Sequence, residues 1–379
     1  MTTAAPPPKS EWAARLWHGA DLFAWMRLLV RNHFAVQPPY WHIAAVASAA
    51  SVMNSTLRVL TEACYGGAVA RTPIRQAPLF IVGHWRTGTT LLHELLILDP
   101  RHAFPTTYQC LAPHHFLLTQ RTFPRLFWFL MPSRRPMDNM AAGYDKPQED
   151  EFALAVLGAP SPYLTIAFPN HPPQDQDALD LERLTPRALA GWKRTFLHFL
   201  RGLTFADPRR LVLKSPTHSC RIKTLLELFP DARFVHIVRD PFTVFPSTVN
   251  LWKSLYRNHG LQTPTFAGLE EHIFRTFNHL YTKLEEGERL LAPGRFHELR
   301  YEDLIHDPEG QMRLLYDRLG LGGFDEALPG IRKYLAENAG YQTNRYPSLA
   351  PELRAEIARR WGAVIERYGY GKAGEGAVA

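Results

Sequence analysis

The strongest pattern of apolar positions in this chain predicts a strand, a glycine loop and a helix between residues 78 and 98. Four consecutive apolar residues, 79–82, are typical of a strand that is covered on both faces. Gly83 opens a loop that closes at Gly88, and leucines recur at helical spacing from Thr89 onward. The N–H groups of such a loop and the positive end of the helix dipole attract anions. We therefore expect an anion to bind between this strand and this helix.

A second pattern, between residues 211 and 247, predicts two more strands. One apolar strand ends at Lys214 and the next, 233–238, ends at Arg239, with a helical segment between them. This order predicts that the two strands are parallel neighbours in one sheet, with Lys214 and Arg239 at the same carboxyl edge, where ligands bind. Ser247 follows Arg239 by eight residues, and we expect it at the start of the next helix.

These patterns predict an α/β protein with a central parallel sheet flanked by helices and a helical N-terminal extension. The chain has 379 residues, of which 46% are apolar, and this is enough for a large core. The first ten residues are rich in proline and alanine, which favours a disordered tail over a signal peptide. The expected boundaries are a disordered tail at 1–10, the helical extension at 11–75, the α/β domain at 76–372 and a flexible tail at 373–379.

The extension is expected to be helical from Trp12 to about Val69. Its most apolar run, 42–53, has about a dozen residues, whereas a helix needs roughly twenty to span a bilayer. Two interpretations remain open. The extension packs on the core or on a second copy of the chain, or it anchors the protein at a membrane interface through an exposed aromatic face. One apolar face would include Trp17, Leu22, Phe23, Trp25, Met26, Leu29 and Val30.

The charge of the chain indicates which ligands it binds, and its cysteine content indicates the compartment in which it works. The formal charge of +7 favours anionic ligands or surfaces, but no cluster of lysine and arginine with interleaved aromatics indicates nucleic acid. The three cysteines are widely spaced, so we expect no disulfide framework and place the protein in a reducing cytoplasm. No set of histidine, cysteine and carboxylate residues has the spacing of metal ligands, and we expect no metal.

The glycine loop is close to a P-loop, but it lacks the lysine that should follow the second glycine. Arg86 lies inside the loop instead, and its guanidinium can neutralise phosphate oxygens without the usual Mg²⁺. An ordinary strand-to-helix turn with an exposed arginine is the alternative. A P-loop kinase or NTPase also stays open. The residues expected to bind the anion are Arg86, Thr87, Gly88, Thr89 and Thr90.

Three other segments carry expectations about the surroundings of this site. Residues 115–136 mix aromatic and aliphatic residues with arginines, and they form either the wall of an apolar acceptor pocket or a core helix with a basic rim. Residues 160–173 are rich in proline and are expected to connect elements on the surface. Residues 185–202 predict an amphipathic helix capped by Thr185.

The loop 83–90, Gly-His-Trp-Arg-Thr-Gly-Thr-Thr, resembles the 5′-phosphosulfate loop Gly-x-x-Arg-Ser-Gly-Thr-Thr of sulfotransferases that use 3′-phosphoadenosine-5′-phosphosulfate (PAPS). Arg239 and Ser247 fall on the arginine and serine of that family's 3′-phosphate site, and Lys214 matches its strand-end lysine. The resemblance therefore implies the P-loop-like sulfotransferase fold. Two ordered motifs about 150 residues apart make coincidence improbable.

Two weaker likenesses extend the resemblance to about residues 78–370. Residues 299–304 and 308–319 resemble the strand and helix that close the family's sheet. Residues 343–347 are similar to a loop that covers the nucleotide in some members, which adds Arg345 to the expected donor site. The whole is most similar to the large, mainly bacterial branch of the family.

The resemblance implies transfer of a sulfuryl group from PAPS, as co-substrate, to a hydroxyl or amine, with adenosine 3′,5′-bisphosphate as the product and no metal. The sequence does not identify the acceptor, and an apolar small molecule or a lipid is expected. Lys214 would contact the transferring group, and Arg86 would help it to stabilise developing charge. The remaining alternative is a catalytically idle nucleotide-binding scaffold held at membranes by the N-terminal helices.

The sequence identifies the general base less clearly than the other residues of the site. Family members place a histidine or glutamate soon after the first loop or beside the strand-end lysine, but residues 104–109 contain no acid. Glu149 is our first candidate, because a helix starting near Asp145 would turn it inward on an apolar face. The alternative is that the acids 149–151 complement the helix dipole on a solvated turn. The other candidates are Glu151, His218 and the pair His114 and His115.

Overall fold

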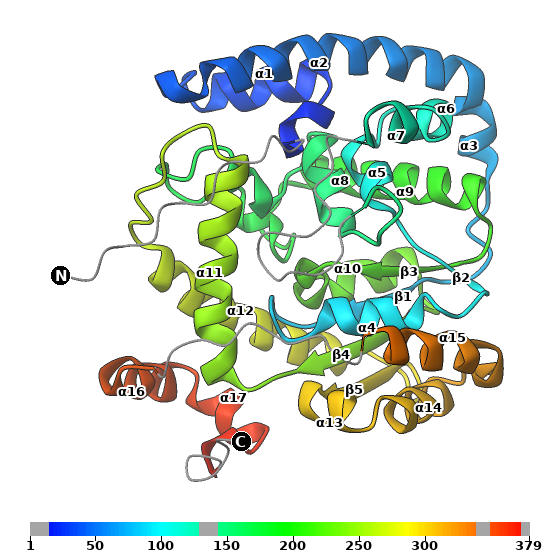
Figure 1. Ribbon diagram of the computed structural model, residues 1–379, viewed down its shortest axis with the longest axis vertical. Helices are drawn as coiled ribbons and strands as arrows, with labels where there is room; N and C mark the ends of the chain where they lie inside the picture. Colours follow the sequence, from blue (N-terminus) through cyan, green and yellow to red (C-terminus); the bar gives the residue numbers. More distant parts are fainter. Residues whose placement is uncertain (1–14, 129–142, 339–348, 373–379) are drawn as a thin grey trace.

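The computed structural model describes residues 15–128, 143–338 and 349–372, and within them it contains one five-stranded parallel sheet (Figure 1). The strand order is β2-β3-β1-β4-β5, so the strand that precedes the glycine loop lies at the centre. The α/β class, the parallel sheet and the helical N-terminal region are confirmed. The strands are β1 (Leu79–Val82), β2 (His102–Ala103), β3 (Arg210–Lys214), β4 (Arg233–Val238) and β5 (Phe296–Arg300).

The expectation that β3 and β4 are adjacent is wrong, because β1 lies between them. Leu79 pairs with Val212 of β3 on one side and with Arg233 of β4 on the other, and both pairings are parallel. The local strand–helix–strand order gives the direction of the two strands but not whether a third strand enters the gap. Consequently Lys214 and Arg239 flank the glycine loop from opposite sides, at the carboxyl edge of the sheet.

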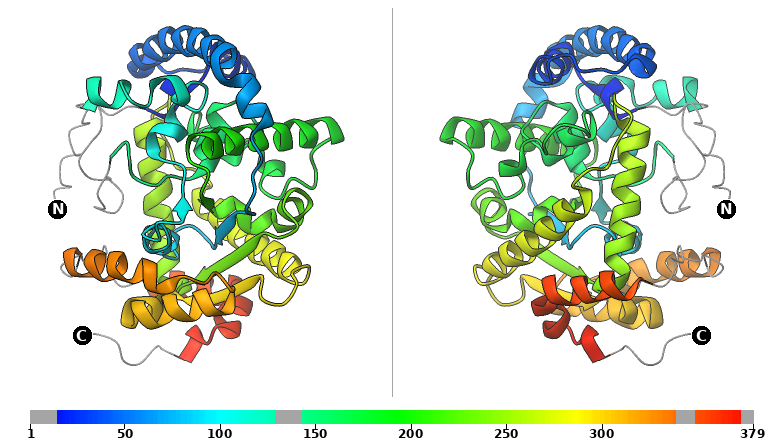
Figure 2. Two further views of the ribbon diagram at one scale, coloured as in Figure 1. Left: turned by 90° about the vertical axis from the view of Figure 1, so that its right-hand side faces the viewer. Right: turned by 90° about the vertical axis from the view of Figure 1, so that its left-hand side faces the viewer.

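The side chains of β1 alternate between two cores. Leu79 and Ile81 pack with one hydrophobic cluster, which includes residues of α4 and α13–α15, while Phe80 and Val82 belong to the larger cluster with residues of α8–α12. All four side chains are fully buried, as a strand covered on both faces requires. Views from the two sides of the molecule, each at right angles to Figure 1, show helices on either side of the sheet (Figure 2). The helices after β1 are α4 (Thr89–Leu96), α5 (Thr107–Leu111), α6 (Phe116–Thr119), α7 (Phe123–Leu126), α8 (Asp150–Val156), α9 (Pro186–Ala206), α10 (Ile222–Leu228), α11 (Pro241–His259), α12 (Leu269–Glu288), α13 (Tyr301–His306), α14 (Pro308–Arg318), α15 (Phe324–Glu337), α16 (Pro351–Arg360) and α17 (Gly362–Arg367).

The predicted cap of α9 is confirmed, because the Thr185 side chain accepts a hydrogen bond from Ala188 N and Pro186 is the first helical residue. Residues 160–173 do not form a surface connection as expected. They contain the 3₁₀-helix η5 (Pro162–Ile166), in which Tyr163 and Ile166 are buried. Proline fixes backbone angles but says little about exposure, and the aromatic and aliphatic residues beside it decide the burial.

Residues 116–128 do not form the single core helix that was one of the two expectations. They contain the short helices α6 and α7, and Leu126 at the end of α7 is exposed. The rest of the segment 115–136 lies outside the described residues, so a role as a pocket wall stays a prediction.

The N-terminal region forms a layer of helices over one end of the molecule (Figures 1 and 2). Its longest helix runs without a break from Pro38 to Arg71. It therefore extends well beyond both ends of the apolar run 42–53 that the sequence shows. The elements are η1 (Leu16–Gly19), α1 (Leu22–Arg31), η2 (Pro38–Tyr40), α2 (Trp41–Thr61), the π-helical segment η3 (Glu62–Gly66) and α3 (Gly67–Arg71).

Candidate active site

The glycine loop after β1 is tightly enclosed at both of its glycines. Gly83 has φ +148° and Gly88 has φ +100°, angles that favour glycine. A Cβ atom at Gly88 would lie 2.3 Å from the ring of Tyr301, and one at Gly83 would lie 2.7 Å from Ile237 O. The Thr87 hydroxyl donates to His84 O at 2.8 Å and stabilises the turn. The loop therefore lies against β4 and α13, with α4 starting directly behind it.

The charged groups expected at the donor site meet at this loop. Arg86 adopts φ +70°, a strained angle for a residue with a side chain, and its Nε donates to Ser247 Oγ at 2.9 Å. Arg239 Nη1 donates to Arg86 O at 3.3 Å, and its guanidinium lies 4.1 Å from the centre of the Tyr301 ring. Ser247 is buried in the second turn of α11 rather than at its start. The structure thus brings Arg86, Arg239 and Ser247 together, although they are up to 161 residues apart in sequence.

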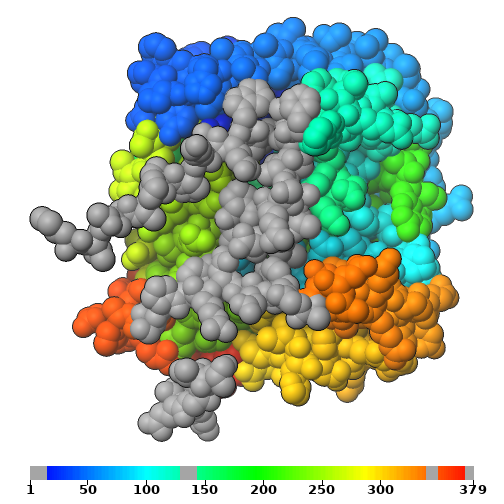
Figure 3. Space-filling view, in the orientation of Figure 1, coloured from blue at the N-terminus to red at the C-terminus, as the bar shows by residue number. Residues whose placement is uncertain are grey.

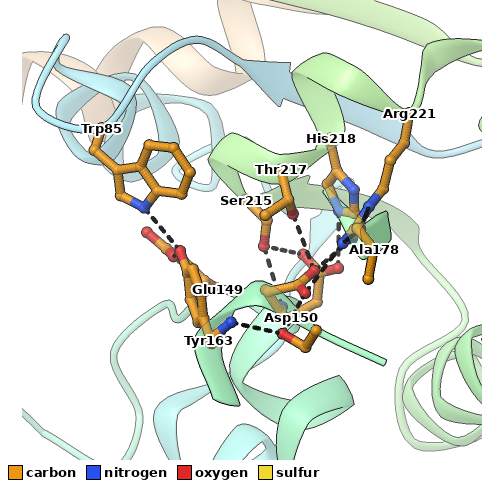
Figure 4. Close-up of polar contacts among 11 residues, drawn as sticks. Trp85, Glu149, Asp150, Tyr163, Ala178, Ser215, Thr217, His218 and Arg221 are labelled. Carbon is orange, nitrogen blue, oxygen red and sulfur yellow. Dashed lines mark hydrogen bonds and ion pairs between the residues drawn. The ribbon is translucent and has the colours of Figure 1, made fainter. Parts of the chain in front are cut away.

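On the other side of the loop, a carboxylate is held between a lysine and a tyrosine. Lys214, the last residue of β3, donates from Nζ to Glu149 Oε1 at 2.7 Å. The Tyr163 hydroxyl donates to Glu149 Oε2 at 2.5 Å, and Trp85 Nε1 donates to the Tyr163 oxygen at 2.9 Å (Figure 4). Because Trp85 belongs to the glycine loop, these two hydrogen bonds connect the loop to the carboxylate through Tyr163. The Glu149 side chain is 14% exposed, so one edge of it remains accessible.

The helix that carries Glu149 starts later than predicted. α8 begins at Asp150, not near Asp145, and Glu149 occupies the N-cap position with extended backbone angles. Its side chain therefore points to Lys214 because of the cap geometry, and not because of a helical face. Its side chain makes no capping hydrogen bond to the first turn of α8.

The two acids that follow Glu149, Asp150 and Glu151, are fully buried rather than solvated. Asp150 accepts a hydrogen bond from the Ser215 hydroxyl at 2.9 Å and pairs with His218 Nε2 at 2.8 Å. Burial alone would raise the pKa of Asp150, but the charge and hydrogen bonds of His218 and Ser215 hold it below its usual value. Glu151 pairs with Arg221 and accepts from the Thr217 hydroxyl at 2.9 Å. The three consecutive acids Glu149, Asp150 and Glu151 thus pair with three basic residues of one short segment, Lys214, His218 and Arg221.

Comparison with known proteins identifies the family. The family model described as "Sulfotransferase family" matches residues 78–326. The omega-hydroxy-beta-dihydromenaquinone-9 sulfotransferases of Mycobacterium bovis and Mycobacterium tuberculosis are each 56% identical to this chain over 360 residues, covering 95% of it and 92% of the relative. The chain belongs to the sulfotransferase family. The enzyme class and the bacterial branch expected from sequence are confirmed, and the kinase and NTPase alternatives are not favoured.

Solved structures agree on the fold. A sulfotransferase from Mycobacterium avium aligns with 96% of this chain and 98% of its own, with a TM-score of 0.66 at 20% identity. A second, from Mycobacterium tuberculosis, covers 94% of this chain and 100% of its own with a TM-score of 0.57 at 19% identity. In both, the alignment extends over nearly the whole of this sulfotransferase.

The histidines proposed as alternative bases lie in buried positions of this sulfotransferase. His218 is fully buried, bonded to Asp150, and its ring packs edge-on against Phe80. His115 bonds to Asn54 of α2 and to Thr119 of α6, away from Lys214. Burial lowers the pKa of His114 and of His115 to about 4. These positions suit structural roles, as does that of the buried and hydrogen-bonded Glu151. Glu149, which is partly exposed beside Lys214, stays our first candidate for the general base.

Sequence reasoning missed Tyr163 and Trp85. Tyr163 lies in the proline-rich stretch that seemed to be a surface connection, and no spacing links it to Glu149, 14 residues earlier. Trp85 is one of the variable positions of the glycine motif, so the motif gave it no role. Arg345 lies outside the described residues. Within 15–128, 143–338 and 349–372, no group of three or more histidine, cysteine, aspartate or glutamate side chains is arranged to hold a metal ion.

Proposed function

We propose that this sulfotransferase transfers a sulfuryl group from PAPS to a hydroxyl group of an apolar lipid and releases adenosine 3′,5′-bisphosphate. The observation that carries the proposal is the convergence of Arg86, Lys214 and Arg239 on one edge of the sheet, beside Glu149. Fixed positive charge at a glycine loop that lacks the P-loop lysine suits a phosphosulfate bound without Mg²⁺.

The residues present fit a 3′-phosphorylated adenosine nucleotide. Gly83 and Gly88 pack against Ile237 and Tyr301, which fixes the backbone of the loop, and the N–H groups of such a loop can bind a 5′-phosphate. Arg86, Thr87, Gly88, Thr89 and Thr90 would hold the 5′-phosphosulfate. Arg239 and Ser247 would hold the 3′-phosphate, and Arg345 remains a proposed contact of the nucleotide. Tyr301 holds the Arg239 guanidinium by stacking, which limits the conformations that a phosphate contact must order.

In the proposed reaction the acceptor oxygen attacks sulfur in line while the bond from sulfur to the bridging phosphate oxygen breaks. The Glu149 carboxylate accepts the proton of the acceptor hydroxyl, and the electron pair of the broken bond stays on the phosphate. Lys214 and Arg86 stabilise the charge that develops on the leaving oxygen and on the sulfuryl oxygens. Tyr163 and Lys214 each hold one oxygen of Glu149, so its orientation is fixed before the acceptor arrives.

The acceptor class is proposed from the relatives. Proteins that are 56% identical over nearly the full chain are named for an omega-hydroxylated dihydromenaquinone, in which the hydroxyl lies at the far end of an apolar isoprenoid chain. We therefore propose a hydroxylated, long-chain isoprenoid lipid as the acceptor. We further propose a cytoplasmic location, peripheral to the membrane that holds such lipids, which agrees with three free cysteines.

The test is transfer of the label from ³⁵S-PAPS to lipids. The purified protein is incubated with ³⁵S-PAPS and detergent-dispersed hydroxylated isoprenoid quinones, and the products are separated by chromatography. Water-soluble phenols, alcohols and amines serve as parallel acceptors. We expect a labelled lipid that is absent when Lys214→Ala replaces the wild type. Labelling of the soluble acceptors alone would contradict the lipid acceptor, and no labelled product with any acceptor would contradict the proposed reaction.

A further inference from the structure

The long N-terminal helix exposes its apolar side to solvent. The helix Pro38–Arg71 has 34 residues, a mean hydropathy of 1.4 in its most apolar window, and only 22% of that window buried. Between Trp41 and Leu57 it carries no aspartate, glutamate, lysine or arginine. A surface helix of a water-soluble protein normally presents charged residues outward. The outward apolar residues are Trp41, Ala45, Val46, Ala49, Val52, Met53, Val59 and Leu60, and the polar His42, Thr56 and Arg58 are exposed beside them.

The preceding helix adds an aromatic residue and an arginine to the same layer. α1 exposes Leu22, Phe23, Met26 and Val30, and Phe23 is 67% exposed. The Arg27 guanidinium lies 4.5 Å from the centre of the Phe23 ring. α1 packs along α2, and both lie at the same end of the molecule (Figures 1 and 3). We refer to the outward apolar side chains of α1 and α2 as the apolar face.

Hydrogen bonds of buried polar groups fix the inner side of the two helices to the rest of the protein. Asn54 Nδ2 donates to His18 O at 2.8 Å and to Ala20 O at 2.9 Å, and Asn54 Oδ1 bonds to His115. Trp25 Nε1 donates to Ser48 Oγ at 2.9 Å. Because these contacts hold α2 against the rest of the protein, α2 is suited to lie in the plane of a membrane surface and not to cross it.

The charge around the apolar face favours an anionic surface. The described N-terminal segment, residues 15–77, contains six arginines, whereas its acids are Asp21 and Glu62. Arg58 pairs with the buried Asp21 at 2.7 Å and Arg31 pairs with Asp175 at 2.7 Å, so these two arginines are already neutralised. The segment still has more arginines than acids, which gives it a positive charge. Arginines beside exposed aromatic and aliphatic side chains are the composition of helices that bind to anionic lipid surfaces.

The apolar face is also close to the candidate active site. α8 begins beside Glu149, and its seven residues span about 10 Å. At its far end Arg27 of α1 donates to Gly158 O at 3.2 Å, and an added Cβ at Gly158 would lie 3.0 Å from Ala24. One short helix therefore separates the proposed base from the helix that carries Phe23.

We propose that the apolar face docks this sulfotransferase on the surface of a membrane that contains anionic lipids. The outward side chains of α1 and α2 enter the boundary between headgroups and acyl chains, and the arginines around them contact lipid phosphates. Docking holds the start of α8 at a distance from the lipid that is set by the length of α8 and the thickness of α1. The delivery of a lipid acceptor to Glu149 rests on the proposed function, whereas the docking itself does not.

Vesicle flotation tests the docking. The full-length protein is mixed with vesicles of phosphatidylcholine or of phosphatidylcholine with phosphatidylglycerol, and the floating fraction is measured. We expect binding to the mixed vesicles that weakens in high salt. Val52→Gln/Met53→Gln/Val59→Gln removes three outward side chains and keeps helix propensity. It should lower the partition coefficient by at least about tenfold, because each inserted aliphatic side chain contributes to binding.

The matched control is Ile305→Gln/Leu314→Gln, which replaces exposed aliphatic residues of α13 and α14 at the other end of the molecule (Figure 1). It should float like the wild type. Equal flotation of wild type and triple variant, or no flotation of the wild type, would overturn the proposal. A wild-type dimer that the triple variant converts to a monomer, without flotation, would assign the face to a second copy of the chain. Transfer to a detergent-dispersed acceptor, measured in parallel, separates failure of docking from failure of the proposed reaction.

Discussion

Lys214 Nζ lies 2.7 Å from Glu149 Oε1, so the end of strand β3 and the start of helix α8 meet in one ion pair beside the glycine loop. The two side chains are 5% and 14% exposed, respectively. Their different exposure suits different tasks. The less exposed lysine can place positive charge at the sheet edge, and the carboxylate retains an accessible edge that can accept a proton.

Glu149→Gln should lower turnover by roughly two to four orders of magnitude, because the amide keeps the volume of the side chain but cannot accept a proton. Affinity for adenosine 3′,5′-bisphosphate should change little. Tyr163→Phe keeps the carboxylate and removes one hydrogen bond to it, so a loss of about tenfold to a hundredfold is expected. Single-turnover ³⁵S transfer and calorimetric titration on the same samples measure both quantities. Near-normal turnover in Glu149→Gln would exclude Glu149 as the base.

Lys214→Met should separate catalysis from binding. If Lys214 acts on charge that develops during transfer, turnover should fall by about a hundredfold or more, while the affinity for adenosine 3′,5′-bisphosphate falls less than about tenfold. Rates and dissociation constants of wild type and variant decide this. Equal losses in both would make Lys214 a binding residue only.

Glu151, two residues after Glu149, should matter for stability rather than for catalysis. Glu151 is fully buried and paired with Arg221, so Glu151→Gln leaves a buried guanidinium without its counter-charge. Breaking a buried ion pair costs about 3 to 5 kcal/mol in the free energy of unfolding. Denaturant unfolding of Glu151→Gln should show this loss, whereas Glu149→Gln, at a partly exposed position, should lose less. A stable Glu151→Gln that is inactive would show that the roles of the two acids are reversed.

Stability should fall as the pH falls below about 6.5. Burial lowers the pKa of His18 and of His259 to about 4, while an unfolded histidine titrates near 6.5. Between these values the unfolded chain binds protons that the folded chain does not, so acid favours unfolding by about 1.4 kcal/mol per pH unit for each histidine. His259→Gln should flatten the pH dependence of the free energy of unfolding. The exposed His306→Gln is the control, and an equal effect of both would contradict this explanation.

The parts of the site that are local in sequence could be predicted. Gly83, Arg86 and Gly88 follow a buried strand directly, and the strand-end position of Lys214 follows from the chain order alone. The insertion of β1 between β3 and β4 could not be predicted, because local pattern does not determine strand order. The tyrosine on Glu149 was missed for a related reason. Tyr163 reaches its partner through tertiary packing of a proline-rich turn, which leaves no periodic signal.

The N-terminal helices show the same division. The sequence predicts helices between Trp12 and about Val69, but its periodicity does not show which side faces the protein. In the structure Trp25 and Leu29 are buried, whereas Phe23 and Val30 of the same helix are exposed. The buried polar contacts of Asn54 turn the apolar side of α2 outward, and only the folded arrangement shows this.

The central claim is that the carboxyl edge of the sheet binds a 3′-phosphorylated adenosine nucleotide through Arg86, Arg239 and Ser247. Isothermal titration of the wild type and of Arg239→Ala with adenosine 3′,5′-bisphosphate and with ATP tests it most directly. A charge-assisted contact to phosphate contributes about 1.5 to 3 kcal/mol. The bisphosphate should therefore bind the wild type about tenfold or more tightly than ATP, and Arg239→Ala should remove this preference. Equal affinity of the wild type for both nucleotides, or an unchanged affinity of Arg239→Ala for the bisphosphate, would contradict the claim.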